Sequence, residues 1–169
     1  ALDLYKAIIK QFPHNKRAQI GIEQLKHLNI QKANPSQQNI DTLVELYQTG
    51  RYAEAEKLSQ LMTQDFPKHS FGWKVLGAVL KETGRISESI VPFKKSLEIT
   101  PQDPIAQSNL GVTLQALGRL EEAETFLRQA IALKFDYATA HNNLGITLHA
   151  LGRLEEAESS LKQAVSLKP

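Results

Sequence analysis

The sequence predicts an all-α fold, an α-solenoid made of repeated antiparallel helix pairs. Residues 104–135 and 138–169 share NLG, TL, ALGRLEEAE and LK in the same order. Self-similarity at a fixed period of this length is typical of repeat architectures. Within each period, apolar residues recur at helical spacing on both sides of a glycine, which indicates two helices joined by a tight turn.

The period is 34 residues, and it divides most of the chain into equivalent units. It relates Gly145 to Gly111 and Gly77, and it relates Gly118 to Gly84 and Gly50. The four units are 36–69, 70–103, 104–137 and 138–169. The expected first helices are 36–49, 70–83, 104–117 and 138–151, and the expected second helices are 52–65, 86–99, 120–133 and 154–167.

Capping residues support these helix starts. Asp103 is a good N-cap, and Pro104 is a good first helical residue. We expect Asn34-Pro35 to play the same part before the first unit, with Gln37 three residues after the cap. Phe135 replaces the closing proline of the third unit, and we expect Asp136 to supply the N-cap there.

Residues 1–35 carry a partial N-terminal repeat and an irregular junction. Residues 1–13 resemble a second helix, with Tyr5 and Ile8 packed and Pro13 closing it. Residues 16–30 resemble a first helix whose apolar stripe is Ile20, Ile22, Leu25 and Leu28. The distance from Pro13 to Pro67 is one period plus 20 residues, so one second helix is missing. We therefore expect an irregular junction near Ile30–Asn34, with four regular units over 36–169.

Small residues indicate where paired helices meet. Gly77, Gly111 and Gly145 lie inside first helices, where each glycine costs about 1 kcal/mol relative to alanine. Because this loss of helix stability recurs at the same position of three units, we expect the glycines to be needed for a close helix–helix contact. The matching small residues of the second helices are Ala55, Ala123 and Ala157. The large residues Trp73, Phe93, Leu76, Leu127 and Leu110 are expected to fill the core around this contact.

These residues resemble a known family. Trp73, Leu76 and Gly77, followed by Gly84, Ile86, Ser89, Phe93 and Pro101, resemble the tetratricopeptide repeat, as does NLG…GRLEEA in the last two units. The array is similar to bacterial tetratricopeptide arrays and to the repeats of O-linked N-acetylglucosamine transferase. The resemblance covers residues 36–169. It implies a right-handed superhelix whose first helices line a concave face, where extended peptides usually bind.

The resemblance also supplies candidate groove residues. From the first unit they are Gln37, Asp41, Val44 and Gln48, and from the second Phe71, Lys74, Ala78 and Lys81. From the third they are Ser108, Asn109, Val112 and Gln115, and from the fourth Asn142, Asn143, Ile146 and His149. Asn109 and Asn143 are one period apart, and an amide can donate to and accept from a peptide main chain. The two asparagines either form hydrogen bonds to the main chain of a peptide or are simply common residues at this position of the repeat.

The carboxylate clamp of chaperone-binding relatives is not matched. Such a clamp needs Lys and Asn one turn apart, but Lys74 is followed one turn later by Ala78. Ile105 stands where the family pattern would have Lys. We therefore do not expect recognition of a terminal carboxylate.

No catalytic, metal or cofactor site stands out. His141 and His149 are eight residues apart, not the four that would place two metal ligands on one helix face. Glu121, Glu122 and Glu124 begin a second helix, where they favour the helix dipole and face water. The chain has no cysteine. We expect no enzyme activity and no cofactor.

The composition of the chain limits the classes of partner that it is expected to bind. The net charge is +2, and basic residues alternate with acidic ones, so nucleic acid is not an expected ligand. No apolar run is long enough to cross a membrane. These features suit a cytoplasmic protein, and Ala1 and Pro169 suggest a piece of a longer chain.

Three functions fit the sequence. The first is a module that binds a peptide or a partner protein in the concave groove. The second is the non-catalytic, substrate-presenting arm of a larger glycosyltransferase- or sulfotransferase-type enzyme. The third is a scaffold that self-assembles head to tail through open ends. For the third, the stripe of Leu154, Ala157, Leu161, Ala164 and Val165 is expected to be exposed, with residues 1–13 as its partner surface.

Overall fold

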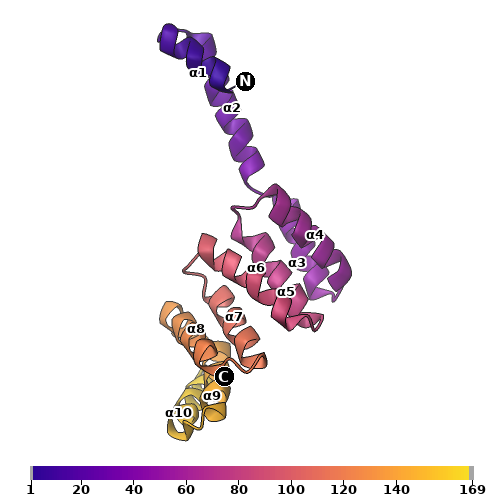
Figure 1. Cartoon of the computed structure of the whole chain (residues 1–169), viewed down its shortest axis with the longest axis vertical. Coiled ribbons are helices and arrows are strands. Elements are labelled where there is room, and N and C mark those ends of the chain that lie inside the picture. Colours follow the sequence, from indigo (N-terminus) through magenta and orange to yellow (C-terminus); the bar gives the residue numbers. More distant parts are fainter. Residues whose placement is uncertain (1, 168–169) are drawn as a thin grey trace.

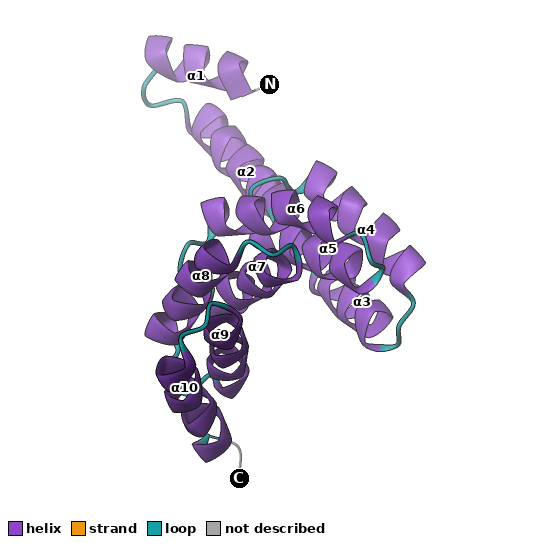
Figure 2. Cartoon of the chain, turned by 60° about the horizontal axis from the view of Figure 1, so that its bottom comes forward, coloured by secondary structure: helices purple, strands orange, loops and turns teal. Residues whose placement is uncertain are grey.

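The computed structural model describes residues 2–167, with side chains for residues 6–24 and 34–167. Within this part the secondary structure is entirely helical, without a strand (Figures 1 and 2). The helices are α1 Leu2–Gln11, α2 Lys16–Ala33, α3 Gln37–Gln48, α4 Tyr52–Asp65, α5 Ser70–Glu82, α6 Ile86–Ile99, α7 Pro104–Ala116, α8 Leu120–Leu133, α9 Ala138–Ala150 and α10 Leu154–Ser166. From α3 to α10, both ends of every helix lie within one residue of the predicted bounds.

The architecture is a right-handed α-solenoid of antiparallel helix pairs. The pairs α3–α4, α5–α6, α7–α8 and α9–α10 follow one another, and each pair packs on the next (Figure 1). A single amphipathic pair cannot cover both of its apolar faces, so stacking creates one core that runs along the array.

Glycine ends each first helix. After α7, Gly118 has φ +73°, a left-handed conformation that side chains other than glycine rarely adopt. The Gly118 N–H donates to Gln115 O at 2.9 Å, and the Arg119 N–H donates to Leu114 O at 2.9 Å. This pair of bonds is a Schellman motif, and it reverses the chain directly into the second helix. The same turn recurs in the other three units.

The N-caps confirm one prediction and correct two. Asp103 Oδ1 accepts from the Ile105 and Ala106 N–H groups, as expected. Before α3, Ser36 rather than Asn34 is the cap, and its Oγ accepts from the Asn39 N–H at 3.2 Å.

Before α9, Tyr137 occupies the N-cap position, without a side-chain bond. The prediction that Asp136 caps α9 is wrong. Asp136 lies one residue too early, because Tyr137, not Asp136, is equivalent to Asp103.

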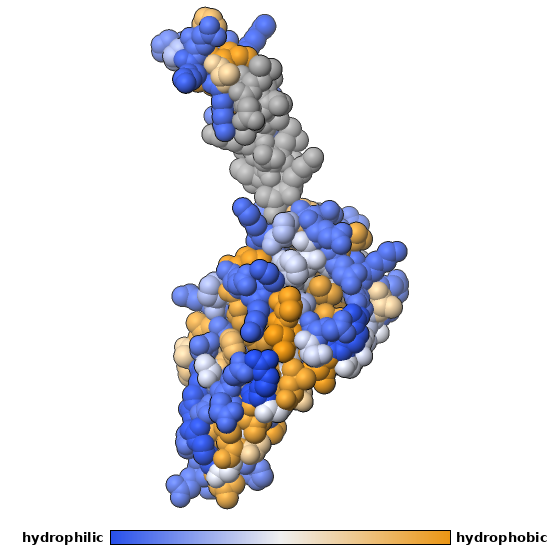
Figure 3. Space-filling model, viewed as in Figure 1, coloured by the Kyte–Doolittle hydropathy of each residue, from blue (hydrophilic) through white to orange (hydrophobic). Residues whose placement is uncertain are grey.

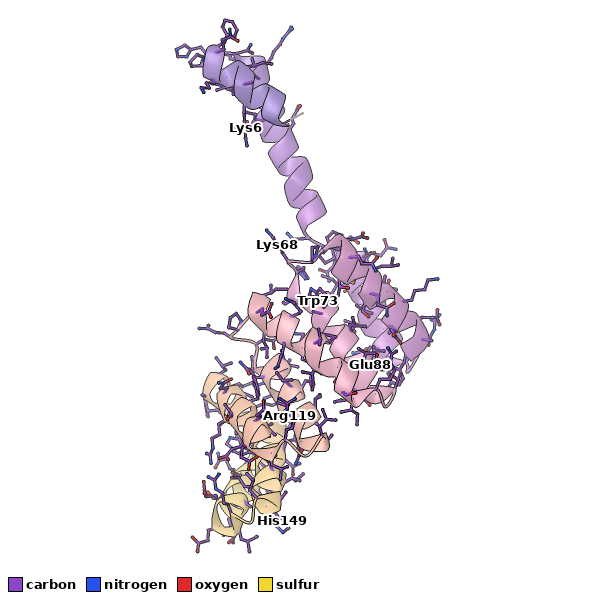
Figure 4. All side chains as sticks on the ribbon, in the orientation of Figure 1. Lys6, Lys68, Trp73, Glu88, Arg119 and His149 are labelled. Carbon is purple, nitrogen blue, oxygen red and sulfur yellow. The ribbon has the colours of Figure 1, made fainter. Side chains whose placement is uncertain are left out.

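A recurrent hydrogen bond braces the turn between units. Trp73 Nε1 donates to Pro67 O, Gln107 Nε2 donates to Pro101 O, and His141 Nε2 is bonded to Phe135 O. Three chemically different side chains thus make the same bond, six residues back along the chain. Trp73 was expected in the core, but it is only half-buried, and Figure 4 shows it just below the turn that carries Lys68.

A hydrogen bond of the same kind shows which type of hairpin α1 and α2 form. Gln19 Nε2 donates to Pro13 O at 2.9 Å, again six residues back. Asn15 caps α2 by accepting from the Ala18 N–H, as Asp103 does for Ala106. The α1–α2 hairpin therefore has the geometry of a second helix followed by the first helix of the next unit.

The junction between α2 and α3 is shorter than expected. α2 continues as a helix to Ala33, and only Asn34 to Ser36 separate it from α3. α2 projects away from the body formed by α3–α10 (Figure 1). Ile20 is 53% exposed, which contradicts its place in the expected apolar stripe. The expected packing of Tyr5, Leu25 and Leu28 lies outside the described side chains.

The small residues meet as predicted. A Cβ at Gly111 would stand 2.7 Å from Leu127 Cγ and 3.2 Å from Ala123 O. A Cβ at Gly145 would stand 2.6 Å from Leu161 Cγ. Such distances leave no room for a side chain, so these glycines set how closely the paired helices approach. The matching alanines are buried: Ala55, Ala123 and Ala157.

Candidate functional site

The first helices form the inner layer of the array. Within the described helices, the backbones of α3 and α5, of α5 and α7, and of α7 and α9 come close together, whereas those of successive second helices do not. The second helices α8 and α10 are bridged by the long side chains of Arg128 and Glu156. Stacked pairs whose first helices touch while their second helices diverge must curve toward the first-helix side. The candidate groove therefore lies along α3, α5, α7 and α9.

Two matching stripes on α7 and α9 form the candidate groove surface. On α7 the stripe is Ile105, Asn109, Val112 and Ala116, and on α9 it is Thr139, Asn143, Ile146 and Ala150. Spacing of four, then three, then four residues places each set on one helix face. Ile105 and Ile146 are exposed apolar side chains, and each stripe has an asparagine in it. An apolar band crosses the α5 and α7 part of the molecule in Figure 3.

The asparagine side chains are free to bind. Asn109 O accepts from Thr113 Oγ1 at 2.9 Å, and Asn143 O accepts from Thr147 Oγ1 at 2.8 Å. Both threonines are fully buried, so these bonds hold the main chain and leave the amide groups uninvolved. Within the described side chains, neither asparagine amide forms a hydrogen bond, and neither is buried without a partner.

Lys74 is engaged in an ion pair. Its Nζ lies 2.7 Å from Asp103 Oδ2, and both side chains are mostly buried. Burial by itself would raise the pKa of the Asp103 carboxyl, but the hydrogen bonds from Lys74 and from the Ala106 N–H, together with the lysine charge, outweigh it and lower that pKa. Lys74 of α5 is thus bound to the residue that caps α7. Lys81 Nζ lies 3.3 Å from Glu82 Oε1.

The remaining candidates are dispersed. Ser108 is 2% exposed, so it supports the packing of α7. Asn142 lies beside Ala164 in a hollow at the C-terminal end. His149 lies beside Leu161 in another hollow of that end, where Figure 4 labels it. Four candidates are half-buried, namely Gln115, Val112, Val44 and Phe71, and Ala78 is buried. Three candidates on α3 are exposed: Gln37, Asp41 and Gln48. Of these, Gln37 Nε2 donates to Asp41 Oδ1.

The sequence analysis does not identify every residue of the α7 and α9 stripes, which we call the inner stripe. From the sequence, Ile105 is expected in the apolar stripe of its helix and stands where the family has lysine, and Thr139, Ala116 and Ala150 are not among the candidate groove residues. The signal was present in the spacing from Asn109 and Asn143, because residues four before and three or seven after an asparagine share its face.

Neither a metal site nor a membrane span is found among the described residues. Within residues 6–24 and 34–167, no three His, Asp or Glu side chains gather where a metal ion could bind. None of the described helices combines the length and apolarity needed to cross a bilayer.

Comparison with known proteins gives the family. Residues 104–169 match the tetratricopeptide repeat family model. These residues, the third and fourth units of the array, are therefore tetratricopeptide repeats. A search among curated proteins finds no match.

Solved tetratricopeptide repeat structures share the fold of this array. The crystal structure of MamA superposes with a TM-score of 0.69 at 14% identity, over 99% of this chain and 86% of that chain. The MamA MSR-1 C2 structure has a TM-score of 0.64 at 24% identity, over 74% and 72%. The first TPR of Spaghetti (RPAP3) bound to the HSP90 peptide SRMEEVD has a TM-score of 0.58 at 26% identity, over 59% and 79%.

Proposed function

We propose that this tetratricopeptide repeat chain is a non-catalytic protein-interaction module that binds an extended peptide in the groove along its first helices. The observation that carries the proposal is the pair Asn109 and Asn143, which are one period apart and have unengaged amides on the inner stripe. Each amide can donate to a carbonyl and accept from an N–H of a peptide main chain. Two such contacts would hold an extended peptide regardless of its sequence.

The surroundings of the asparagines indicate which peptides bind. Ile105, Val112 and Ile146 offer apolar surface on the same stripes. Lys74 is already paired with Asp103, so it is poorly placed to bind a carboxylate. We therefore infer a preference for neutral or apolar peptide segments over an acidic peptide such as SRMEEVD, the HSP90 peptide bound by the RPAP3 repeat. The other groove contacts would come from Gln115, Lys81 and the exposed part of α3.

The division of the chain follows from this role. Residues 36–169 act as the four-unit binding array, and residues 1–35 act as a partial N-terminal repeat that projects from it. The proposal places the protein in the cytoplasm, with peptides or proteins rather than nucleic acid, membranes or cofactors as partners. The same groove would serve a substrate-presenting arm of a larger glycosyltransferase- or sulfotransferase-type enzyme.

The test is a double substitution in the inner stripe. Asn109→Ala with Asn143→Ala should weaken binding to an immobilised library of ten-residue peptides, and helical circular dichroism should stay unchanged. Gln129→Ala with Gln163→Ala is the matched control, because both are exposed amide side chains on second helices, outside the stripes. Fluorescence polarisation of a selected peptide then measures the change in Kd. Equal affinity in the parent and the Asn109/Asn143 variant would refute the asparagine contact.

A further inference from the structure

A hollow of about 360 Å³ lies between the second helices α8 and α10, and we call it the outer hollow. α9 also contributes to its lining, and these three helices pack together in Figure 1. Six of the residues that line it are Arg128, Ile131, Ala132, His141, Leu144 and Ser160. The outer hollow therefore lies between the third and fourth units, where both of its walls are described.

The outer hollow occurs at a position where the other units have a larger side chain. Ser160 is equivalent to an apolar residue in each of the three preceding second helices: Leu58, Pro92 and Phe126. Phe126 is half-buried and packs against the core cluster that contains Leu110. Leu110 is equivalent to Leu144, which lines the outer hollow. One unit earlier, a phenylalanine ring thus packs against the kind of surface that Ser160 leaves open.

The walls of the outer hollow resemble the surroundings of Phe126. Leu144 and Ile131 are equivalent to Leu110 and Leu97, and Leu97 packs against the same cluster as Phe126. Ala132 stands where the preceding unit has Glu98, so this wall is smaller and carries no charge. A side chain as large as that of phenylalanine therefore fits here, and burial of its ring against leucine and isoleucine is favourable.

Arg128 favours an aromatic occupant over an aliphatic one. Its Nε lies 2.8 Å from Glu124 Oε1, and its Nη2 lies 2.9 Å from Glu156 Oε2. These two ion pairs hold the guanidinium group beside the outer hollow, which Arg128 lines. A guanidinium group close to the face of an aromatic ring attracts the ring electrostatically.

His141 supplies a hydrogen-bond acceptor to the same place. Its Nε2 lies 2.9 Å from Phe135 O, and a carbonyl oxygen can only accept, so Nε2 carries the proton. When the imidazole is neutral, Nδ1 is then an acceptor. Nδ1 has no hydrogen-bond partner among the described side chains, and it is not buried. An aromatic ring with a hydroxyl group would find a partner for that hydroxyl here.

We propose that the outer hollow is a second binding site, and that it takes the side chain of a tyrosine from a partner protein. The ring would occupy the place that Phe126 fills one unit earlier, and the hydroxyl would donate to His141 Nδ1. In the third unit the ring is presented by the main chain of a helix, and a segment of another protein that lies over α8 and α10 would present a ring in the same way. The site is separate from the groove, because it lies on the side of the second helices.

The test uses two probes, which are p-cresol, the isolated side chain of tyrosine, and the tripeptide N-acetyl-Gly-Tyr-Gly-amide. Both should shift the NMR amide signals of Ile131, His141 and Ser160 saturably. The tyrosine tripeptide should bind about threefold or more tightly than the corresponding phenylalanine and leucine tripeptides, because these lack the hydroxyl group.

Two substitutions at one position distinguish a filled from an open hollow. Ser160→Phe should abolish the saturable shifts by both probes, because the new ring fills the outer hollow, and it should raise the melting temperature. Ser160→Ala is the matched control: it leaves the outer hollow open and should keep the affinity of the parent for both probes.

Five results would overturn the proposal. The first two are the absence of saturable shifts in the parent and the persistence of the shifts in Ser160→Phe. The third is binding of p-cresol without binding of the tyrosine tripeptide, which would indicate a site for small molecules. The fourth is equal affinity for the tyrosine and leucine tripeptides, and the fifth is a lower melting temperature for Ser160→Phe. The Asn109→Ala, Asn143→Ala protein should bind both probes normally, so the outer hollow and the groove can fail independently.

Discussion

Gly77 of α5 lies against the ring of Phe93 of α6, so closely that a Cβ at Gly77 would stand 2.8 Å from Phe93 Cδ1. The same close approach recurs between Gly111 and Leu127, one period later, and between Gly145 and Leu161, two periods later. Glycine therefore recurs here because the partner side chain fills the space of its Cβ. The helix penalty of the glycine is offset by burial of a large apolar group on the second helix.

Enlarging the glycine of the third unit should separate its helices. Gly111→Leu places a side chain where Leu127 Cγ already lies, and overpacking typically costs about 1–3 kcal/mol. Urea unfolding followed by circular dichroism should show this loss. Ala116→Leu is the control, because Ala116 is exposed on the same helix and should change stability little. Identical unfolding midpoints for Gly111→Leu and the parent would contradict the packing.

Removing a core leucine should leave a cavity. Leu110 is fully buried together with Phe93 and Leu114, so Leu110→Ala should lower the free energy of unfolding by about 2–5 kcal/mol. Ile105→Ala, on the exposed side of the same helix, should cost far less. Thermal melts of the two variants give the comparison, and a similar melting temperature for both would show that Leu110 is not a core residue.

In the first unit, the large residue of this helix–helix contact lies on the first helix and the small residue on the second helix. Leu43 stands at the position of Gly77, and Ser59 stands at the position of Phe93; both are fully buried. Leu43→Ala and Ser59→Leu should each destabilise the protein, the first by a cavity and the second by overpacking. The double variant should be more stable than the sum of the two changes predicts, because the new leucine occupies the vacated space. A double-mutant cycle from urea unfolding measures this coupling, and a coupling near zero would show that the two side chains do not meet.

The Asp103–Lys74 pair should make stability depend on pH. The pKa of Asp103 is lowered in the folded state, so its contribution is fully present above the unfolded pKa of about 3.9 and is lost as pH falls through the folded pKa. Asp103→Asn keeps a capping side chain but removes the charge, and it should cost about 1 kcal/mol at pH 7. The difference from the parent should shrink below pH 4. Unfolding free energies measured from pH 2 to pH 7 test this, and a constant difference would contradict it.

The sequence alone determined the helix order, the helix bounds and the glycine contacts of α3–α10. This was possible because these features are local or periodic. Turn glycines end helices by backbone conformation, and apolar spacing specifies which face is buried. Gly111 was predicted to touch a second helix from its cost in a helix interior, and Gly111 lies against Leu127.

The tertiary structure decided which polar residues are available, because that depends on neighbours that are distant in the sequence. The sequence pattern predicts Lys74 as a groove cation, but in the structure its Nζ donates to Asp103 Oδ2, 29 residues later. Ser108 of α7 and Asn142 of α9 occupy equivalent positions, yet Ser108 is buried and Asn142 is exposed. A further first helix, α9, contacts α7, whereas no first helix is described after α9. Burial at a given position of a repeat depends on the next repeat, and a single-unit pattern does not contain that information.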